Sequence, residues 1–177
     1  MTITPAQRST RPQAAEHSPY YGTYIARVPD GDIVETLARV DDGILPLLRA
    51  LHESAAGKRY AEGKWSIREV VGHVTDTERV FAYRAMRFAR NDETELPGFD
   101  ENTFVTNASF DSRTLADLLD EFEAVRHASV LMYRSLNADE WNRHGTANRA
   151  RMSVRAYAWM TAGHELHHVG ILTSRYL

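Results

Sequence analysis

The strongest chemical signal in the chain lies near its C-terminal end, in residues 163–168, which read GHELHH. His164 and His168 are four residues apart, so a helix would place them about 40° apart on one face. Two imidazoles one turn apart have Cβ atoms roughly 5–6 Å apart and can chelate a single ion. His167 is rotated about 60° from that face and is a weaker candidate. The spacing therefore indicates part of a divalent metal site.

A third ligand is expected upstream, because only nine residues follow His168 and none of them is His, Asp or Glu. His73 is the best candidate, since it lies at the edge of an apolar stripe in a predicted helix. Glu69, Asp76 and Arg84 fall within about 60° of His73 on a helical wheel. Such a polar group at an inner helix edge suggests a pocket. These three residues are the candidates for orienting a ligand or a substrate, and no catalytic residue is assigned.

Three neutral imidazoles would leave a fourth position open for water, as in catalytic rather than closed structural sites. Water bound there would have a lowered pKa and could act as a nucleophile or a base. Imidazole suits zinc, nickel, iron and copper, so the spacing alone does not name the ion. Purely structural roles for these residues remain open. The histidines could be hydrogen-bonded core residues, and Glu69 could form a structural ion pair with Arg84.

Two other functions fit the same residues. Positions 164–168 also spell H-E-x-x-H, the pattern of zincin peptidases, in which Glu165 would act as general base. That hypothesis is weaker, because a zincin usually takes its third ligand from further along the chain. The second alternative is a non-catalytic bundle that binds a metal or a ligand, such as a stress-response protein.

The elements that must position these side chains are helical. Apolar residues recur at helical spacing over residues 32–54, 67–90, 113–136 and 154–175. Ser66 and Glu69 form a capping box that begins the second segment, and Pro46 predicts a kink within the first. No segment shows the period-2 pattern of a strand. The sequence predicts an all-α four-helix bundle with a long connection over residues 91–111, which is a candidate lid.

Length and composition indicate the domain organisation, the classes of partner and the location of the protein. The 177 residues suit one domain, and we expect an extended N-terminal arm over residues 1–28 and the bundle over residues 29–177. The absence of cysteine excludes disulfides and thiolate ligands, and the net charge of −3 gives no reason to expect nucleic acid or membrane as a partner. No signal peptide or membrane span is evident, so we expect a cytoplasmic protein. Arg126 is expected on a solvated helix face.

Several short motifs, in order and at fitting distances, carry a family resemblance. They are KWSIREVVGH (64–73) with TERVFAYR (77–84), LPGFDE (96–101), WNR (141–143), and SVR (153–155) with GHELHH (163–168). On these motifs the chain, from about residue 20 to its end, resembles the DinB-like (YfiT-like) superfamily of metalloenzymes.

The resemblance implies a four-helix bundle with up-down-down-up topology, often dimeric, so a homodimer is expected. It implies a three-histidine site, whose positions match His73, His164 and His168 in this chain, and nickel or zinc as the ion. Some relatives transfer thiols with bacillithiol or mycothiol. We therefore expect a metal-dependent enzyme that hydrolyses or transfers a small-molecule thiol, with a small molecule such as a low-molecular-weight thiol as its substrate.

Overall fold

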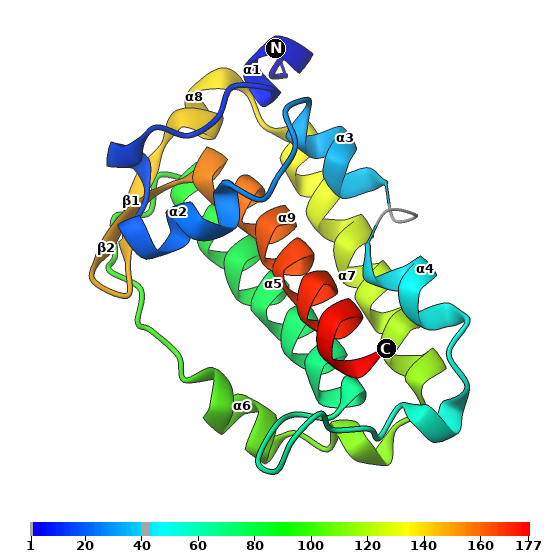
Figure 1. Ribbon diagram of the computed structural model, residues 1–177. Helices are drawn as coiled ribbons and strands as arrows, with labels where there is room; N and C mark the ends of the chain where they lie inside the picture. Colours follow the sequence, from blue (N-terminus) through cyan, green and yellow to red (C-terminus); the bar gives the residue numbers. More distant parts are fainter. Residues whose placement is uncertain (1, 40–42) are drawn as a thin grey trace.

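The computed structural model describes residues 2–39 and 43–177. Its main body is a bundle of four helical columns (Figure 1). The first column consists of two short helices, and each of the other three is one long helix. The columns are α3 (Ile33–Ala38) with α4 (Ile44–Arg49), α5 (Ile67–Ala89), α7 (Leu115–Ser135) and α9 (Val154–Ile171).

The directions of the columns confirm the predicted up-down-down-up topology. In Figure 1, α5 and α7 run the same way, whereas α3–α4 and α9 run the opposite way. Because α5 and α7 are parallel, the chain between them must return along the full length of the bundle. That return contains α6 (Glu101–Asn107) and a 3₁₀ turn at Phe110–Ser112. The long connection predicted from the sequence therefore serves this topology.

Helix α5 begins where the sequence predicts. The Ser66 hydroxyl accepts a hydrogen bond from the Glu69 backbone N–H at 3.1 Å, and the Glu69 carboxylate accepts one from the Ser66 N–H at 2.7 Å. This reciprocal capping box satisfies two N–H groups that a helix start would leave unpaired. The other end of the helix is followed by Asn91, whose φ of 60° ends the helical path.

The first predicted helix is two helices rather than one kinked helix. Helix α3 ends at Ala38, and α4 begins at Ile44. Residues 40–42 lie outside the described residues. Pro46 is the third residue of α4, in the first turn, where a backbone N–H has no partner within the helix and its loss costs little. The kink predicted at Pro46 is therefore wrong, and the proline is compatible with the start of a new helix.

A β-hairpin was not expected from the sequence. Strands β1 (His144–Ala147) and β2 (Ala150–Ser153) pair antiparallel, with Asn148 and Arg149 forming the turn at φ of 51° and 62°. Positive φ at both turn residues matches the twist of a two-residue hairpin. The strands have only four residues each, which is too short for a clear alternating pattern. They lie between α8 (Ala138–Asn142) and α9.

The N-terminal residues run across the bundle but are partly helical. They include α1 (Pro5–Arg8), a 3₁₀ turn at Ala14–Glu16 and α2 (Pro19–Ile25). Figure 1 shows α2 lying beside the upper part of α9, and Ile25 is buried in the core. The arm is therefore part of the wall of the bundle, and its division from the domain at residue 28 stays a prediction.

The buried interior has three layers. One apolar cluster surrounds Phe88, Tyr133 and Trp159, and a second surrounds Leu48 and Phe122. Between these clusters lie buried polar side chains from α5, α7 and α9, which we call the polar layer. Its members are His73, Thr77, Glu78, Arg126, Thr161, His164, Glu165 and His168.

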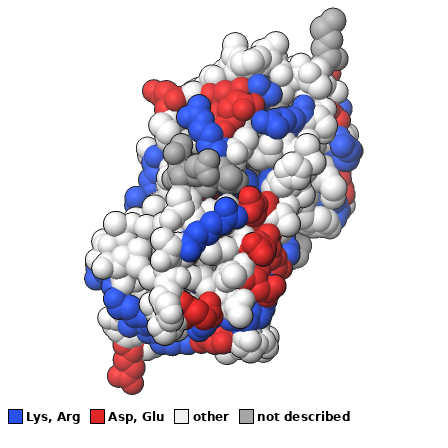
Figure 2. Space-filling view, turned by 90° about the vertical axis from the view of Figure 1, so that its right-hand side faces the viewer, with Lys and Arg blue, Asp and Glu red and all other residues white. Residues whose placement is uncertain are grey.

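The surface carries both signs of charge. Figure 2 shows basic and acidic side chains intermixed over the face that it presents. Ion pairs at the surface of the described residues include Arg79 with Glu121 and Arg90 with Glu140. Within the described part of the chain, no helix is both long enough and apolar enough to cross a membrane.

Candidate metal centre

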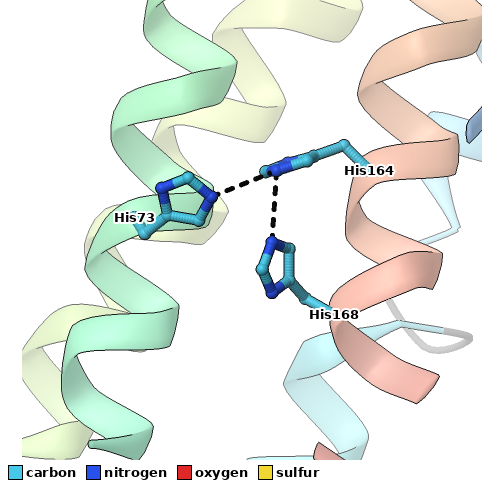
Figure 3. Close-up of side chains that lie close together, drawn as sticks. All are labelled: His73, His164 and His168. Atoms are coloured by element: carbon cyan, nitrogen blue, oxygen red, sulfur yellow. Dashed lines mark hydrogen bonds between the residues drawn. The ribbon is translucent and has the colours of Figure 1, made fainter. Parts of the chain in front are cut away.

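The structure brings His73, His164 and His168 together inside the bundle. His73 lies on α5, and the other two lie one turn apart on the neighbouring helix α9 (Figure 3). The Nε2 atom of His164 lies 3.2 Å from that of His73 and 3.2 Å from that of His168. One nitrogen from each ring is within 4.8 Å of the other two. The two helices therefore direct three donor nitrogens to one point.

The spacing of these nitrogens fits a metal ion. A tetrahedral ion with Zn–N bonds of about 2.0–2.1 Å holds its ligand atoms roughly 3.3 Å from one another. The two measured separations of 3.2 Å are close to that edge length. The donor set, three imidazoles with no thiolate or carboxylate among them, suits zinc, nickel, iron or copper. The residues present therefore fit such an ion.

Burial keeps the three rings neutral. Loss of solvent lowers the pKa of His73 to about 4, with a smaller contribution from the nearby His167. The pKa values of His164 and His168 are lowered for the same main reason, and the neighbouring histidines add to the effect. A neutral imidazole presents a nitrogen lone pair, which is the form that binds a metal ion. The site therefore needs little deprotonation to accept one.

The Nδ1 atoms of His73 and His168 differ in their hydrogen-bond partners. The Thr77 hydroxyl lies 3.5 Å from Nδ1 of His73, a long contact that can still orient the ring. Nδ1 of His168 is buried and has no hydrogen-bond partner in the described part of the chain. If Nε2 binds an ion, Nδ1 carries the proton, and an unpaired N–H of this kind invites a water or a ligand oxygen.

A cavity of about 460 Å³ opens onto the three rings. Its other walls are mainly aromatic and come from α2, α5, the return between α5 and α7, and the tip of the hairpin. Besides the three histidines, its lining residues are Tyr20, Tyr21, Tyr24, Trp65, Thr77, Phe81, Arg84, Phe99, Glu101, Asn148 and His167.

Of the three orienting candidates, the structure brings only Arg84 to this cavity. Arg84 is buried, and its Nη2 donates to the Pro97 carbonyl at 2.6 Å. Glu69 instead caps α5 and pairs with Arg59 at 2.5 Å, so it forms no ion pair with Arg84.

Asp76 likewise faces away from the cavity, where Arg79 donates to it at 3.1 Å. Helical-wheel proximity to His73 was misleading for both acids, because Arg59 from the segment before α5 holds Glu69 and Arg79 on α5 itself holds Asp76.

Glu165 does not point at the histidines. Its carboxylate accepts from Arg126 at 2.8 Å and from the Ile44 backbone N–H at 2.9 Å. Arg126 also pairs with Glu78 at 2.9 Å, and all three charged groups are buried. This Glu78–Arg126–Glu165 triad lies between α5, α7 and α9. The general-base role of the zincin hypothesis is contradicted by this placement, and Arg126 is not on a solvated face as expected.

The residues that the sequence did not reveal are mostly aromatic. Tyr24 packs edge-on against the rings of His164 and His167, with centroids 5.4 and 5.3 Å apart. The ring centroids of Trp65 and His73 lie 4.7 Å apart. The spacing of Tyr20 and Tyr24, one helical turn apart, was the available signal, but it could not tell which surface the arm would cover.

Comparisons with known proteins agree with this fold. The model of the DinB superfamily matches residues 36–172. Among solved structures, the chain is similar to YfiT from Bacillus subtilis, described as "a probable metal-dependent hydrolase with an unusual four-helix bundle topology". The two share 17% sequence identity with a TM-score of 0.66, over 93% of this chain and 90% of that chain. No curated protein matches. Because the family model spans most of its length, the chain belongs to the DinB superfamily.

Proposed function

We propose that this protein is a metal-dependent enzyme in which His73, His164 and His168 hold one divalent ion. Zinc or nickel is the expected ion, and hydrolysis or transfer of a small-molecule thiol is the expected reaction. The observation that carries the proposal is the approach of three neutral, buried imidazole nitrogens to within 4.8 Å of one another at the wall of a cavity. The similarity to a protein described as "a probable metal-dependent hydrolase" supports it.

The bound ion would supply Lewis acidity, lowering the pKa of a water or thiol and making it a nucleophile at neutral pH. The chain's own residues prepare that position. Thr77 helps to orient the His73 ring, and the edge of Tyr24 covers one side of His164. With three protein ligands, such an ion would have a coordination position left for a water or a substrate. This is the arrangement that a catalytic site requires.

The cavity favours a small-molecule substrate. Its volume of about 460 Å³ lies in the usual range for small-molecule pockets, roughly 300–1,000 Å³. Phe99 and Glu101, from the return between α5 and α7, form part of its rim, which supports the proposal that residues 91–111 act as a lid. A low-molecular-weight thiol is the proposed substrate class, and a cytoplasmic homodimer is the proposed setting.

Metal analysis tests the site directly. Wild-type protein purified without chelators should contain one equivalent of zinc or nickel, and His73→Ala should contain none. His167→Ala is the matched control, because His167 lines the same cavity but is not one of the three converging donors. Equal metal content in wild type and His73→Ala would falsify the three-histidine site.

Activity tests the reaction. Metal-loaded wild type should cleave or transfer thiol conjugates of electrophiles, and the rate should disappear with a chelator and return with the ion. Stoichiometric metal without turnover of any such conjugate would instead favour a non-catalytic metal-binding protein.

A further inference from the structure

One wall of the cavity changes in character along α5. His73, Thr77, Phe81 and Arg84 all line it, and their spacing keeps them on one face of the helix. Arg84 is eleven residues from His73, which corresponds to about 16 Å along the axis and about 20° of rotation. The wall therefore has a metal-binding end, an apolar middle and a cationic end.

Arg84 is a buried cation without a counter-charge. Its exposed fraction is 4%, yet in the described part of the chain no carboxylate lies within ion-pair distance of it. It donates to the Pro97 carbonyl at 2.6 Å, and its guanidinium lies 5.7 Å from the centre of the Phe99 ring. These contacts, and the Tyr157 hydroxyl close enough to hydrogen-bond with the guanidinium, fix the position of the side chain but leave its charge without a carboxylate partner among the described residues.

Arg126, which is also buried, has the carboxylate partners that Arg84 lacks within residues 2–39 and 43–177. Arg126 has an exposed fraction of 2% and is held between the carboxylates of Glu78 and Glu165. Burying a charge is costly unless it is paired, and the triad meets that requirement within the protein. Arg84 is almost equally buried but faces a cavity. An anion entering that cavity would supply the missing partner.

The neighbouring groups do not take this role. Glu101 also lines the cavity, but it is exposed and is close enough to Tyr24 to contribute to that residue's raised pKa, after burial and the hydrogen bond to Tyr20. Burial also raises the pKa of Tyr157, and the adjacent charge of Arg84 opposes that rise. Tyr157 is therefore a neutral hydroxyl beside the guanidinium at neutral pH.

We propose that the cavity takes an elongated small molecule whose oxyanion group, a carboxylate or a phosphate, pairs with Arg84. The apolar body of the molecule then lies along Phe81 and Phe99, and its reacting group reaches the three histidines. A planar guanidinium can bind either oxyanion through two N–H groups, which makes such a pair both strong and directional. Only the position of the reacting group rests on the proposed function, because pairing with Arg84 needs no metal.

The first experiment compares an anion with its neutral analogue. We would titrate chelator-treated protein with 3-phenylpropanoate, with 3-phenylpropanamide and with 2-phenylethyl phosphate. Calorimetry gives the affinity, and tryptophan fluorescence, to which Trp65 in the cavity wall contributes, follows binding. The acid should bind about tenfold or more tightly than the amide, as expected for hydrogen bonds to a charged group. A tighter phosphate would identify the preferred oxyanion. Equal binding of acid and amide, or binding of neither anion, would overturn the proposal.

Substitutions test whether Arg84 causes the preference for the acid over the amide. Arg84→Met should abolish the preference for the acid, whereas Arg84→Lys should retain part of it. Arg79→Met is the matched control on the same helix, because Arg79 is exposed and lies outside the cavity lining. If Arg84→Met does not fold, the acid and amide affinities of Arg84→Lys and of wild type still test whether Arg84 binds the anion. An acid preference that survives in folded Arg84→Met would overturn the proposal.

Metal content, measured on the same wild-type protein purified without chelators and before the chelator treatment, separates the two claims. Wild type that carries no metal at that stage and later prefers the acid contradicts the proposed function alone. Stoichiometric metal without an acid preference contradicts this inference alone.

Discussion

The backbone carbonyl oxygen of Tyr24 lies 2.1 Å from the position that a Cβ atom on residue 163 would occupy. Only glycine at 163 lets α2 lie this close to α9, directly beside His164. The Tyr24 ring then packs edge-on against His164 at 5.4 Å between centroids. A missing side chain on α9 thus allows the N-terminal arm to become a wall of the candidate metal centre.

Gly163→Ala should therefore displace α2. Because the methyl group would meet rigid backbone, we expect a loss of about 1–3 kcal/mol in the free energy of unfolding. Gly170→Ala, on the same helix, is the control, since residue 170 is exposed and nothing lies within 4 Å of its added Cβ. That variant should gain up to about 1 kcal/mol from helix propensity. Denaturant titration measures both, and equal effects would contradict the close packing.

Metal should stabilise the fold by mass action. An ion that binds only the native state adds about 2.7 kcal/mol at a free concentration one hundred times its Kd. Thermal unfolding of chelator-treated wild type should therefore shift upward when zinc or nickel is added. His167→Ala should show the same shift and His73→Ala should not. A shift of equal size in His73→Ala would mean that the ion binds elsewhere.

The Glu78–Arg126–Glu165 triad predicts an asymmetry between its members. Arg126→Met leaves two buried carboxylates without their counter-charge and should cost about 3–5 kcal/mol. Glu165→Gln leaves the Arg126–Glu78 pair intact, so it should cost less. Its metal content should equal that of wild type, because Glu165 faces away from the histidines. Loss of metal in a folded Glu165→Gln protein would contradict this separation.

The attachment of the N-terminal arm should weaken in acid. Burial alone would raise the pKa of Glu16, but hydrogen bonds from Arg155, Gln13 and Ser153 outweigh it and leave the pKa lowered from 4.5. A lowered pKa means that the folded state favours the carboxylate. Its contribution to stability is therefore complete above the unfolded-state pKa and is lost as the pH falls through the folded-state value.

Glu16→Gln provides the measurement. The difference in Tm between wild type and Glu16→Gln should be largest near pH 7 and should shrink as the pH falls below about 4. Glu62→Gln is the control, because Glu62 is exposed. A difference for Glu16→Gln that does not change with pH would show that the carboxylate charge is unimportant there.

The long helices and the convergence of the histidines were accessible from sequence. The Ser66–Glu69 capping box marks the start of α5, and the apolar periodicity of α7 and α9 follows from burial of one face. The spacing of His164 and His168 fixes a pair on one helix face. The approach of His73 required knowledge of which helices are neighbours, and the family resemblance supplied it.

The rest depended on tertiary contacts that no local pattern records. Arg126 looks like any helical surface charge, and its burial is determined by Glu78 and Glu165 on two other helices. Glu69 shares a face with His73 on a helical wheel, but an ion pair with Arg59, which precedes the helix, turns it away. Asp76 is the exception, because its partner Arg79 lies three residues further along the same helix. The hairpin at Asn148 and Arg149 uses left-handed backbone without a glycine, so it lacked the usual turn signal.

The polar layer also determines how the helices align lengthwise. An apolar interface tolerates sliding, because one leucine can replace another at little cost. If α9 moved one turn, about 5.4 Å, along α5 and α7, Glu165 would lose Arg126 and His164 would no longer meet His73. Such a misalignment leaves unpaired charge in the interior and is strongly disfavoured. The polar layer thus fixes the lengthwise alignment of α9 against α5 and α7. The same alignment brings the three imidazoles together, so a misaligned bundle would also lack the candidate metal centre.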